Sequence, residues 1–515
     1  MASTKRFALN VGMNWVSMAV SMVVPFFLTP FVIRSLGVTA YGIWILAVST
    51  VSYLGLLDMG LRSAVIRFVS KAEAQDKPDE AKAAIGAALW FRVLISSGVA
   101  GISILLAFAF PHWFKIPHDL IRAGQITVLM CALGVAVTLT SGVFGAVLAA
   151  THRFDILSSI SMIQTLARAG GVILILKTGH GLVPLACWEL TVITLGGLAT
   201  AGTTLKIFPP CRVRIARPDI ALVKQIWSYS FTTFIFMISV QVIVNTDNLV
   251  VGSFISVGMV AFYSIGSSLV NYAAQAVWSM STTFAPMASN MEAGGRTADL
   301  QRLLLRGTQA SLGIALPISV ALAFRGRTFI SLWMGPQYGP ISETIVQVLL
   351  VSQWFSIANG TAASIVMAID KHKPLANWSV VEAILNLGLS IFLVKTVGMY
   401  GVALGTTIAI TFVHLAFWPR YVRKILGVPI HTFVWSGWLK ITMCSIPYAV
   451  ACILTDRYWH APNIIAFLAQ IVAILPVYAI CVIVVFRSEA RSLLSKWTAS
   501  RILRAAEMQK TGAPL

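Results

Sequence analysis

Fourteen apolar segments dominate the 515-residue sequence, and each is long enough to cross a lipid bilayer as a helix. They are predicted near residues 9–33, 42–68, 84–109, 124–150, 153–176, 181–205, 224–251, 257–287, 304–324, 343–369, 374–394, 398–419, 437–455 and 463–486. Their spacing of about 37 residues allows a crossing of about 20 residues and a short loop. The sequence therefore predicts an all-α polytopic membrane protein without a folded soluble domain.

The composition agrees with this class. Hydrophobic residues make up 57% of the chain and charged residues 11%, against about 25% charged residues in soluble proteins. The first apolar segment continues past about 20 residues without a small-residue cleavage site, which predicts a retained helix rather than a signal peptide. The six cysteines are scattered and lack the close pairing of a metal or redox site.

Basic residues predict the orientation. With the N-terminus inside, about 25 Lys and Arg residues lie on the inner side and about eight on the outer side, as the positive-inside rule expects. Both termini are therefore predicted to be cytoplasmic in a plasma membrane. This distribution accounts for most of the net charge of +20, so the charge does not indicate a nucleic-acid partner.

Two pairs of similar stretches indicate an internal repeat. "SLGVTAYGIW" at 35–44 resembles "SVGMVAFYSIG" at 256–266, and "KTGHGLVPLA" from Lys177 resembles "KTVGMYGVALG" from Lys395. A repeat of six helices gives both copies the same orientation, which is typical of secondary transporters whose lobes alternate around a central cavity. The predicted divisions are an N-lobe at 1–206, an inter-lobe loop at 207–222, a C-lobe at 223–420, two further helices within 421–486 and a basic cytoplasmic tail at 487–515.

A series of motifs resembles one known family. "LLDMGLRSAVIRFVS" at 56–70, "NTDNLVVGSF" at 245–254 and "LWMGPQY" at 332–338 follow the first of these stretches in order. Together, over roughly residues 5–425, they resemble the polysaccharide-transport flippases of the multidrug/oligosaccharidyl-lipid/polysaccharide exporter superfamily. The resemblance implies a bacterial inner-membrane protein that flips undecaprenyl-diphosphate-linked oligosaccharides outward for O-antigen or exopolysaccharide assembly. It also implies membrane lipids, a polysaccharide polymerase and chain-length machinery as partners.

Arginines inside the apolar segments suit such cargo, because arginine forms forked hydrogen bonds with phosphate. Arg168 lies about 22 Å into the fifth segment and is the first candidate for the diphosphate contact. The alternative is a structural ion pair with Glu189 on the next helix. Gly170 and Gly171 follow Arg168 and allow either close helix approach or a local break.

Three charged residues form a second candidate group. Asp58 and Arg62 are expected one turn apart on the second helix, and Arg92 is expected at similar depth on the third. One interpretation is an ion network that joins the two helices. The other is that Arg62 and Arg92 first receive the diphosphate from the inner side.

Embedded carboxylates are candidates for ion coupling or gating, because alternating burial changes how readily a carboxyl group holds a proton or Na⁺. Asp58, Asp247, Glu189 and Glu382 form this set. Asp247 has a second interpretation, as a hydrogen-bond partner near a helix end.

Two other functions compete with the flippase. A multidrug exporter of the same superfamily would use an acidic, aromatic cavity for organic cations, and a membrane glycosyltransferase or polymerase would need a substantial outer loop. The sequence shows no phosphate-binding Gly-Lys loop, no metal-ligand spacing and no nucleophile motif. We therefore expect a non-enzymatic transporter without a cofactor.

Overall fold

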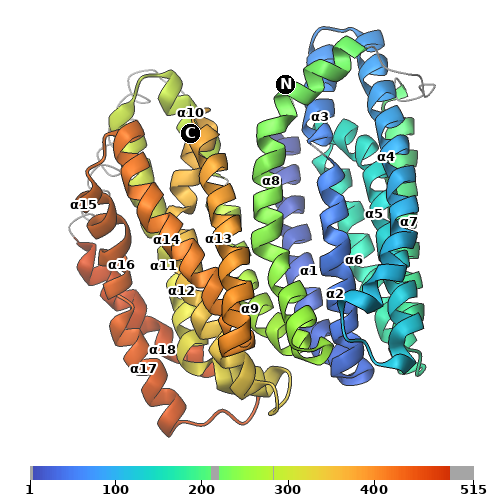
Figure 1. Cartoon of the computed structure of the whole chain (residues 1–515). Helices are drawn as coiled ribbons and strands as arrows, with labels where there is room; N and C mark the ends of the chain where they lie inside the picture. The colour runs from blue at the N-terminus through green and yellow to red at the C-terminus, as the bar shows by residue number, and fades with distance from the viewer. Residues whose placement is uncertain (1–3, 59, 210–219, 282, 488–515) are drawn as a thin grey trace. The chain divides into compact units, whose positions relative to one another are not determined.

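The computed structural model describes residues 4–58, 60–209, 220–281 and 283–487, and nearly all of them are helical (Figure 1). Within them, 14 helices are long and apolar enough to cross a membrane, which confirms the predicted spans. The described residues contain no strand. The tail from residue 488 onward and most of the inter-lobe loop lie outside the described residues, so both remain predictions.

The helices of the first half are α1 (Thr4–Leu36), α2 (Val38–Ser52), η1 (Tyr53–Asp58), α3 (Leu61–Ala74), α4 (Pro78–Trp113), η2 (His118–Leu120), α5 (Ile121–Ala150), α6 (Phe154–Lys177) and α7 (Leu182–Ile207). Those of the second half are α8 (Ile220–Phe254), α9 (Val257–Ser281), α10 (Phe284–Ala293), α11 (Thr297–Trp333), α12 (Gly339–Ala368), α13 (Lys373–Val397) and α14 (Met399–Leu426). The chain ends with α15 (Ile430–Thr432), the π-helical segment η4 (Phe433–Leu439), α16 (Lys440–Met443), α17 (Ile446–Tyr458) and α18 (Ile464–Val485).

The internal repeat is visible in the helix bounds. Helices α4 and α11 begin at residues 78 and 297, which are 219 apart, and α5 and α12 begin at 121 and 339, which are 218 apart. Helices α6 and α13 begin at 154 and 373, again 219 apart. The pairing of helices repeats as well, since α1 packs along α6 and α8 packs along α13. Two related sets of helices followed by additional C-terminal helices are therefore present.

Left-handed turns recur at the same offset. The pairs are Asp76 (φ 52°) with Gly295 (φ 66°), His152 (φ 56°) with Asp370 (φ 55°), and Gly179 (φ 78°) with Gly398 (φ 67°). Each residue follows the end of a helix, where a left-handed residue lets the chain satisfy the last carbonyls of that helix. The repeat thus specifies where the helices stop as well as where they lie.

The second predicted span departs from a continuous helix. Helix α2 passes into the 3-10 segment η1, and α3 begins only after Gly60, whose φ is 73°. A left-handed residue at this position redirects the helix axis. Asp58 and Arg62 therefore lie on different helical segments, and the expectation that they share one helical face is wrong.

The described chain contains two compact units. The first is drawn from residues 1–268 and 372–413, and the second from residues 269–371 and the chain from 414 onward. Unit 1 includes α4, α5 and α7, which run side by side (Figure 1). All seven charged residues predicted for the site belong to unit 1.

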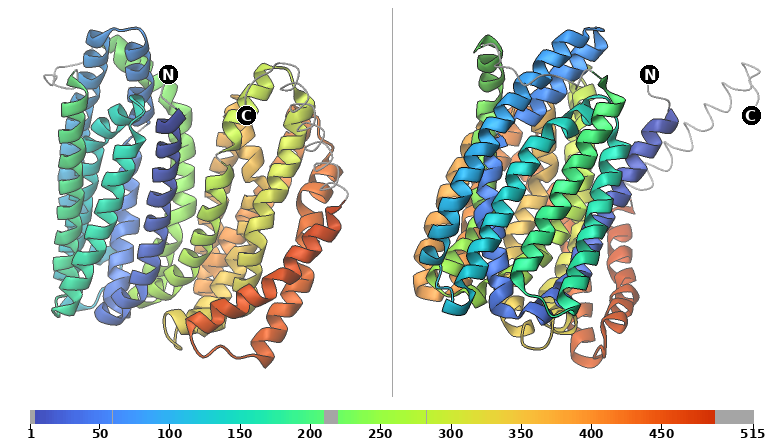
Figure 2. Two further views of the ribbon diagram at one scale, coloured as in Figure 1. Left: turned by 180° about the vertical axis from the view of Figure 1, so that it is seen from behind. Right: turned by 90° about the vertical axis from the view of Figure 1, so that its right-hand side faces the viewer.

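In unit 2 the last two long helices pack on α11 (Figure 2). The buried Arg325 of α11 donates from Nε to Asp456 Oδ1 at 3.3 Å and from Nη2 to Gln470 Oε1 at 2.5 Å. Its guanidinium also lies over the ring of Phe467, 4.6 Å from the centroid. One arginine thus contacts both α17 and α18.

The two longest helices extend well beyond the hydrocarbon core of a bilayer. Helix α4 has 36 residues and α11 has 37, which correspond to about 55 Å against a hydrocarbon core of about 30 Å. The first turns of α4 carry the exposed charged residues Asp79, Glu80 and Lys82. This end of α4 therefore extends beyond the apolar layer.

Candidate functional site

Arg168 and Glu189 form an ion pair between α6 and α7. Arg168 Nε donates to Glu189 Oε2 at 2.6 Å, and the side chains are 41% and 17% exposed, respectively. Because Arg168 is partly exposed and only Nε is used in this pair, its terminal nitrogens can still donate to another acceptor. The ion pair of Arg168 with Glu189, which the sequence analysis gave as the alternative, is therefore present. The contact of Arg168 with a diphosphate remains a prediction.

The helices that carry this pair approach closely at a glycine. Helix α6 continues through Gly170 and Gly171 without a break. A Cβ atom on Gly171 would collide with the indole of Trp188, whereas one on Gly170 would meet nothing within 4 Å. Trp188 Nε1 donates to the carbonyl of Ala167 at 3.2 Å. Of the two interpretations of these glycines, close approach is therefore correct, and Gly171 provides it.

Asp58 and Arg92 form the second pair. Arg92 Nη2 donates to Asp58 Oδ1, and the side chain of Arg92 is 1% exposed whereas that of Asp58 is 26% exposed. Arg92 Nε and Nη1 are buried without a hydrogen-bond partner among the described residues. Arg62 is exposed and forms no ion pair in this part of the chain. The expected triad is therefore a pair, because the break at Gly60 separates Arg62 from Asp58.

Asp247 lies at the centre of a buried polar cluster in unit 1. The hydroxyl of Tyr263 on α9 donates to Asp247 Oδ2 at 2.6 Å, and Thr406 Oγ1 on α14 lies 2.9 Å from Oδ2 and 3.0 Å from Oδ1. Asn386 Nδ2 on α13 donates to Thr406 Oγ1 at 2.9 Å. Asp247 is 6% exposed, so neutral hydroxyl groups hold a buried carboxyl group. Glu382, also on α13, is half-buried.

The Arg168–Glu189 pair and the cluster around Asp247 occupy related positions of the repeat. Arg168 and Asn386 are 218 residues apart, and Glu189 and Thr406 are 217 apart. In both copies a side chain of the fifth helix contacts one of the sixth, as an ion pair in one and as a neutral pair beside Asp247 in the other. The position that carries the cationic Arg168 in the first copy thus carries the neutral Asn386 in the second copy, where it belongs to the cluster around the acidic Asp247.

Tyr263, Asn386 and Thr406 belong to this candidate site, and the sequence reasoning missed them. All three are neutral and lie within apolar segments, where charge alone does not single them out. The available signal was the asparagine in "EAILNLGLS", because a strongly polar side chain inside a membrane helix needs a polar partner.

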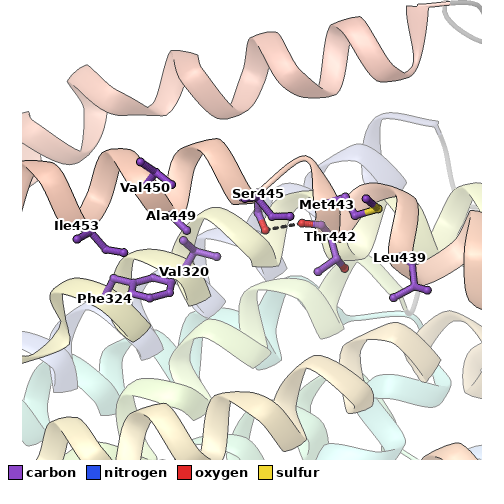
Figure 3. A pocket seen from close by; sticks show the side chains of 10 residues that line it. Val320, Phe324, Leu439, Thr442, Met443, Ser445, Ala449, Val450 and Ile453 are labelled. Atoms are coloured by element: carbon purple, nitrogen blue, oxygen red, sulfur yellow. Dashed lines mark hydrogen bonds between the residues drawn. The ribbon is translucent and has the colours of Figure 1, made fainter.

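An apolar groove lies between α11 and the α16–α17 segment (Figure 3). Val320 and Phe324 line one side, and Met443, Ala449 and Ile453 are among the residues that line the other. Ser445 Oγ is occupied by a hydrogen bond to the carbonyl of Thr442 at 2.6 Å. This lining offers no charged partner to a diphosphate and suits only a hydrocarbon chain. Among the described residues, no three His, Cys, Asp or Glu side chains form a group that could hold a metal ion.

Two repeated sets of membrane-spanning helices, with ion pairs and a buried carboxyl group inside the spans, define a polytopic membrane transporter. The sequence pattern of the family described as "Polysaccharide biosynthesis protein" matches residues 7–292, more than half of the chain. The chain therefore belongs to this family, within the multidrug/oligosaccharidyl-lipid/polysaccharide exporter superfamily predicted from its motifs. A second pattern, MatE, matches residues 233–392.

Two relatives extend the similarity over most of the chain. An uncharacterized membrane protein, EpsK, from Bacillus subtilis (strain 168) is 24% identical over 449 residues, covering 83% of this chain and 85% of the relative. A putative O-antigen transporter from Shigella flexneri is 21% identical over 380 residues, covering 74% and 89%.

Solved structures share the fold. A lipid II flippase, MurJ, in an inward closed conformation superposes with a TM-score of 0.74 at 16% identity, over 94% of this chain and all of that one. An inward-facing MATE-family multidrug resistance transporter gives 0.64 at 13% identity, over 82% and 98%. Together with the family match, these likenesses support a flippase-type transporter related to polysaccharide biosynthesis.

Proposed function

We propose that this protein moves an undecaprenyl-diphosphate-linked oligosaccharide from the inner to the outer leaflet of the bacterial inner membrane, for O-antigen or exopolysaccharide assembly. Both termini are cytoplasmic in this proposal, and the protein breaks no covalent bond. The family match and the O-antigen transporter relative support the cargo class. A polysaccharide polymerase and chain-length machinery would receive the product.

The observation that carries the proposal is the half-exposed Arg168. Its guanidinium is oriented by Glu189 through Nε, which leaves the two terminal nitrogens for a forked contact with phosphate. Arg62, which is exposed, supplies a second cation to the diphosphate. Arg92 is closed off by burial in this structure, so its contact with the diphosphate requires the Asp58 pair to separate.

Ion coupling is assigned to the cluster around Asp247. A carboxyl group surrounded by hydroxyl groups in an apolar interior is stabilised by a bound proton or a small cation. Asp247 provides the charge, and the hydroxyl groups of Tyr263 and Thr406 provide the neighbouring oxygens. Asp58, Glu189 and Glu382 remain secondary candidates, and the coupling cation is a proton or Na⁺.

Thermal stabilisation of the purified protein tests the cargo. A ligand that binds only the folded state raises the melting temperature by mass action. We expect undecaprenyl-diphosphate oligosaccharide to stabilise the wild type, and Arg168→Ala to remain folded but lose this stabilisation. Arg302→Ala is the matched control, because Arg302 is a surface arginine with a side chain that is 66% exposed. Loss of the effect in Arg302→Ala as well would refute the assignment of Arg168.

The second candidate function is an organic-cation antiporter. It is favoured by the MatE match over residues 233–392 and by the buried carboxyl group of Asp247 inside that range. The same melting experiment separates the two functions when tetraphenylphosphonium is added as the probe. Stabilisation by this cation alone, abolished in Asp247→Asn, would replace the flippase proposal.

A further inference from the structure

One end of unit 1 carries five exposed basic side chains. They lie in or beside the turns that follow α1, α4, α6 and α13, and they are Arg34, Lys115, Arg122, Lys177 and Lys395. None of the five forms an ion pair with a residue in the described part of the chain. We call them the outer-end cations, because the distribution of basic residues over the whole chain predicts this end of unit 1 to be the outer one.

Helix packing brings these turns to the same end of unit 1 (Figure 1). Helix α2 packs on both α5 and α8, α1 packs along α6, and α8 packs along α13. A Cβ atom on Gly124, near the start of α5, would lie 3.5 Å from a methyl group of Ile43, near the start of α2. The ammonium group of Lys395 lies over the ring of Phe254, at the end of α8, 5.8 Å from the centroid. The outer-end cations therefore share one face of unit 1.

The charge on this face is one-sided. Five turns lie there, at residues 33–41, 112–123, 176–184, 252–258 and 394–401. Their sequences contain the outer-end cations and a single acidic residue, Asp119. The α3–α4 turn at the opposite end instead holds two lysine–carboxylate pairs, at 2.7 and 3.0 Å. A surface of unbalanced positive charge attracts anionic ligands.

Helix stability does not account for all of these cations. A basic residue in the last turn of a helix is stabilised by the helix dipole, and Arg34, Lys177 and Lys395 lie in such turns. Arg122 instead lies in the first turn of α5, where the dipole disfavours a positive charge, and Lys115 lies between α4 and η2. A partner outside the helices accounts for the basic character of these two positions.

The turn that carries Lys115 and Arg122 is held in one conformation. Phe114 is 3% exposed, and its ring centroid lies 5.0 Å from that of Phe110 on α4. The backbone amide of Phe114 also donates to the carbonyl of Phe110 at 3.3 Å. Trp113, the neighbouring residue, is 50% exposed. A preordered surface loses less freedom on binding, and an exposed indole beside cations offers a sugar ring an apolar surface next to a charge partner.

We propose that the outer-end cations bind acidic sugars of the transported oligosaccharide, so that the cargo is a glycan with carboxylate groups. This inference rests on the proposed function, in which the oligosaccharide emerges at the outer side. A single exposed ion pair contributes little. A chain of uronic-acid residues repeats its carboxylates along its length, however, and can contact several separated cations at once, which strengthens binding without any strong individual contact.

Binding of free oligosaccharides to the purified full-length protein tests this surface without the lipid-linked cargo. In calorimetric titrations at low ionic strength, we expect hexagalacturonate to bind and the neutral maltohexaose not to bind. Lys115→Gln/Arg122→Gln should weaken the binding of hexagalacturonate about tenfold, because two exposed charge contacts are lost. The matched control is Lys71→Gln/Lys206→Gln, which removes the same charge from exposed residues at the opposite end of unit 1 and should leave the affinity unchanged. Equal binding of the two sugars, or equal loss in both double variants, would overturn the proposal.

Two further titrations separate this surface from a lipid site and from the proposed function. Phosphatidylglycerol in mixed micelles is the first probe. If this lipid binds, hexagalacturonate does not, and Lys115→Gln/Arg122→Gln abolishes the lipid binding, the surface binds lipid headgroups and the proposal is wrong. Undecaprenyl-diphosphate oligosaccharide is the second probe. If it fails to bind the wild type while binding of hexagalacturonate still depends on Lys115 and Arg122, the proposed cargo is refuted and the acidic-sugar surface is supported.

Discussion

Removing Asp58 would leave the guanidinium of Arg92 buried without a counter-charge. The side chain of Arg92 is 1% exposed, and two of its nitrogens already lack a partner among the described residues. Loss of one member of a buried ion pair typically destabilises a protein by about 3–5 kcal/mol. We therefore expect Asp58→Ala to lower the melting temperature of the detergent-solubilised protein strongly.

The double variant Asp58→Ala/Arg92→Met should recover much of this stability, because it removes the buried charge as well. Asp79→Ala provides the control, since the side chain of Asp79 is 91% exposed and surface changes typically alter stability by less than about 0.5 kcal/mol. A double variant as unstable as Asp58→Ala would contradict the assigned pair.

Adjacent glycines on α6 give a matched comparison at the Arg168–Glu189 pair. Gly171→Ala should displace Trp188 and destabilise the protein by about 1–3 kcal/mol, as overpacking typically does. Gly170→Ala meets no atom within 4 Å and should be neutral or slightly stabilising, because alanine favours a helix. Thermal unfolding of both variants tests this expectation, and equal effects would argue against the close approach.

The sequence identifies the charged residues of the candidate site but not all of their partners. Arg168 and Glu189 stand out because charges are rare inside apolar segments, and their adjacent helices made the pair a stated alternative. Asp247 stands out for the same reason. Its partners Tyr263 and Thr406 are neutral, and Thr406 lies 159 residues away in the chain, so only the packing of α8 against distant helices brings them together.

Gly60 sets the direction of the chain between η1 and α3. Its φ of 73° is readily available to glycine, whereas a left-handed alanine is disfavoured by about 1–2 kcal/mol. We expect Gly60→Ala to lower the melting temperature by an amount that corresponds to this cost. Gly55→Ala, which meets nothing within 4 Å, is the control, and a smaller effect at Gly60 than at Gly55 would show that the left-handed turn is not required.

For whole helices, hydropathy predicts how many there are far better than it predicts whether each one is continuous. All 14 spans were predictable because burial in lipid depends on local composition. The break after Asp58 was not, since "LLDMGLRS" contains a single glycine within an apolar run and such a glycine is tolerated in many continuous membrane helices. The π-helical segment η4 in the thirteenth span is another departure that composition does not reveal.

Across the whole molecule, the two copies of the repeat carry side chains of different charge at related positions. Arg168 belongs to the first copy, and the neutral pair beside Asp247 belongs to the second. We expect Arg168→Ala to lose stabilisation by the lipid-linked diphosphate while retaining stabilisation by the coupling cation, and Asp247→Asn to show the reverse. A ligand at 100 times its Kd stabilises the folded state by about 2.7 kcal/mol, which a melting curve resolves.

Parallel titrations of each variant with the lipid-linked sugar, with Na⁺ and with protons provide this measurement. Loss of both responses in either single variant, with folding intact, would contradict the division of labour between the two copies. The halves of the repeat would then act as one undivided site.

The exposed turn between α3 and α4 offers a practical reporter of topology. Residues 73–80 are all exposed, and Asp76 closes the turn with a φ of 52°. An epitope tag inserted at this turn is held between α3 and α4. Labelling it in intact cells and in inverted membrane vesicles would reveal which face of the bilayer it occupies. The same tag would give an antibody fragment a rigid attachment point for electron cryomicroscopy of this small membrane protein.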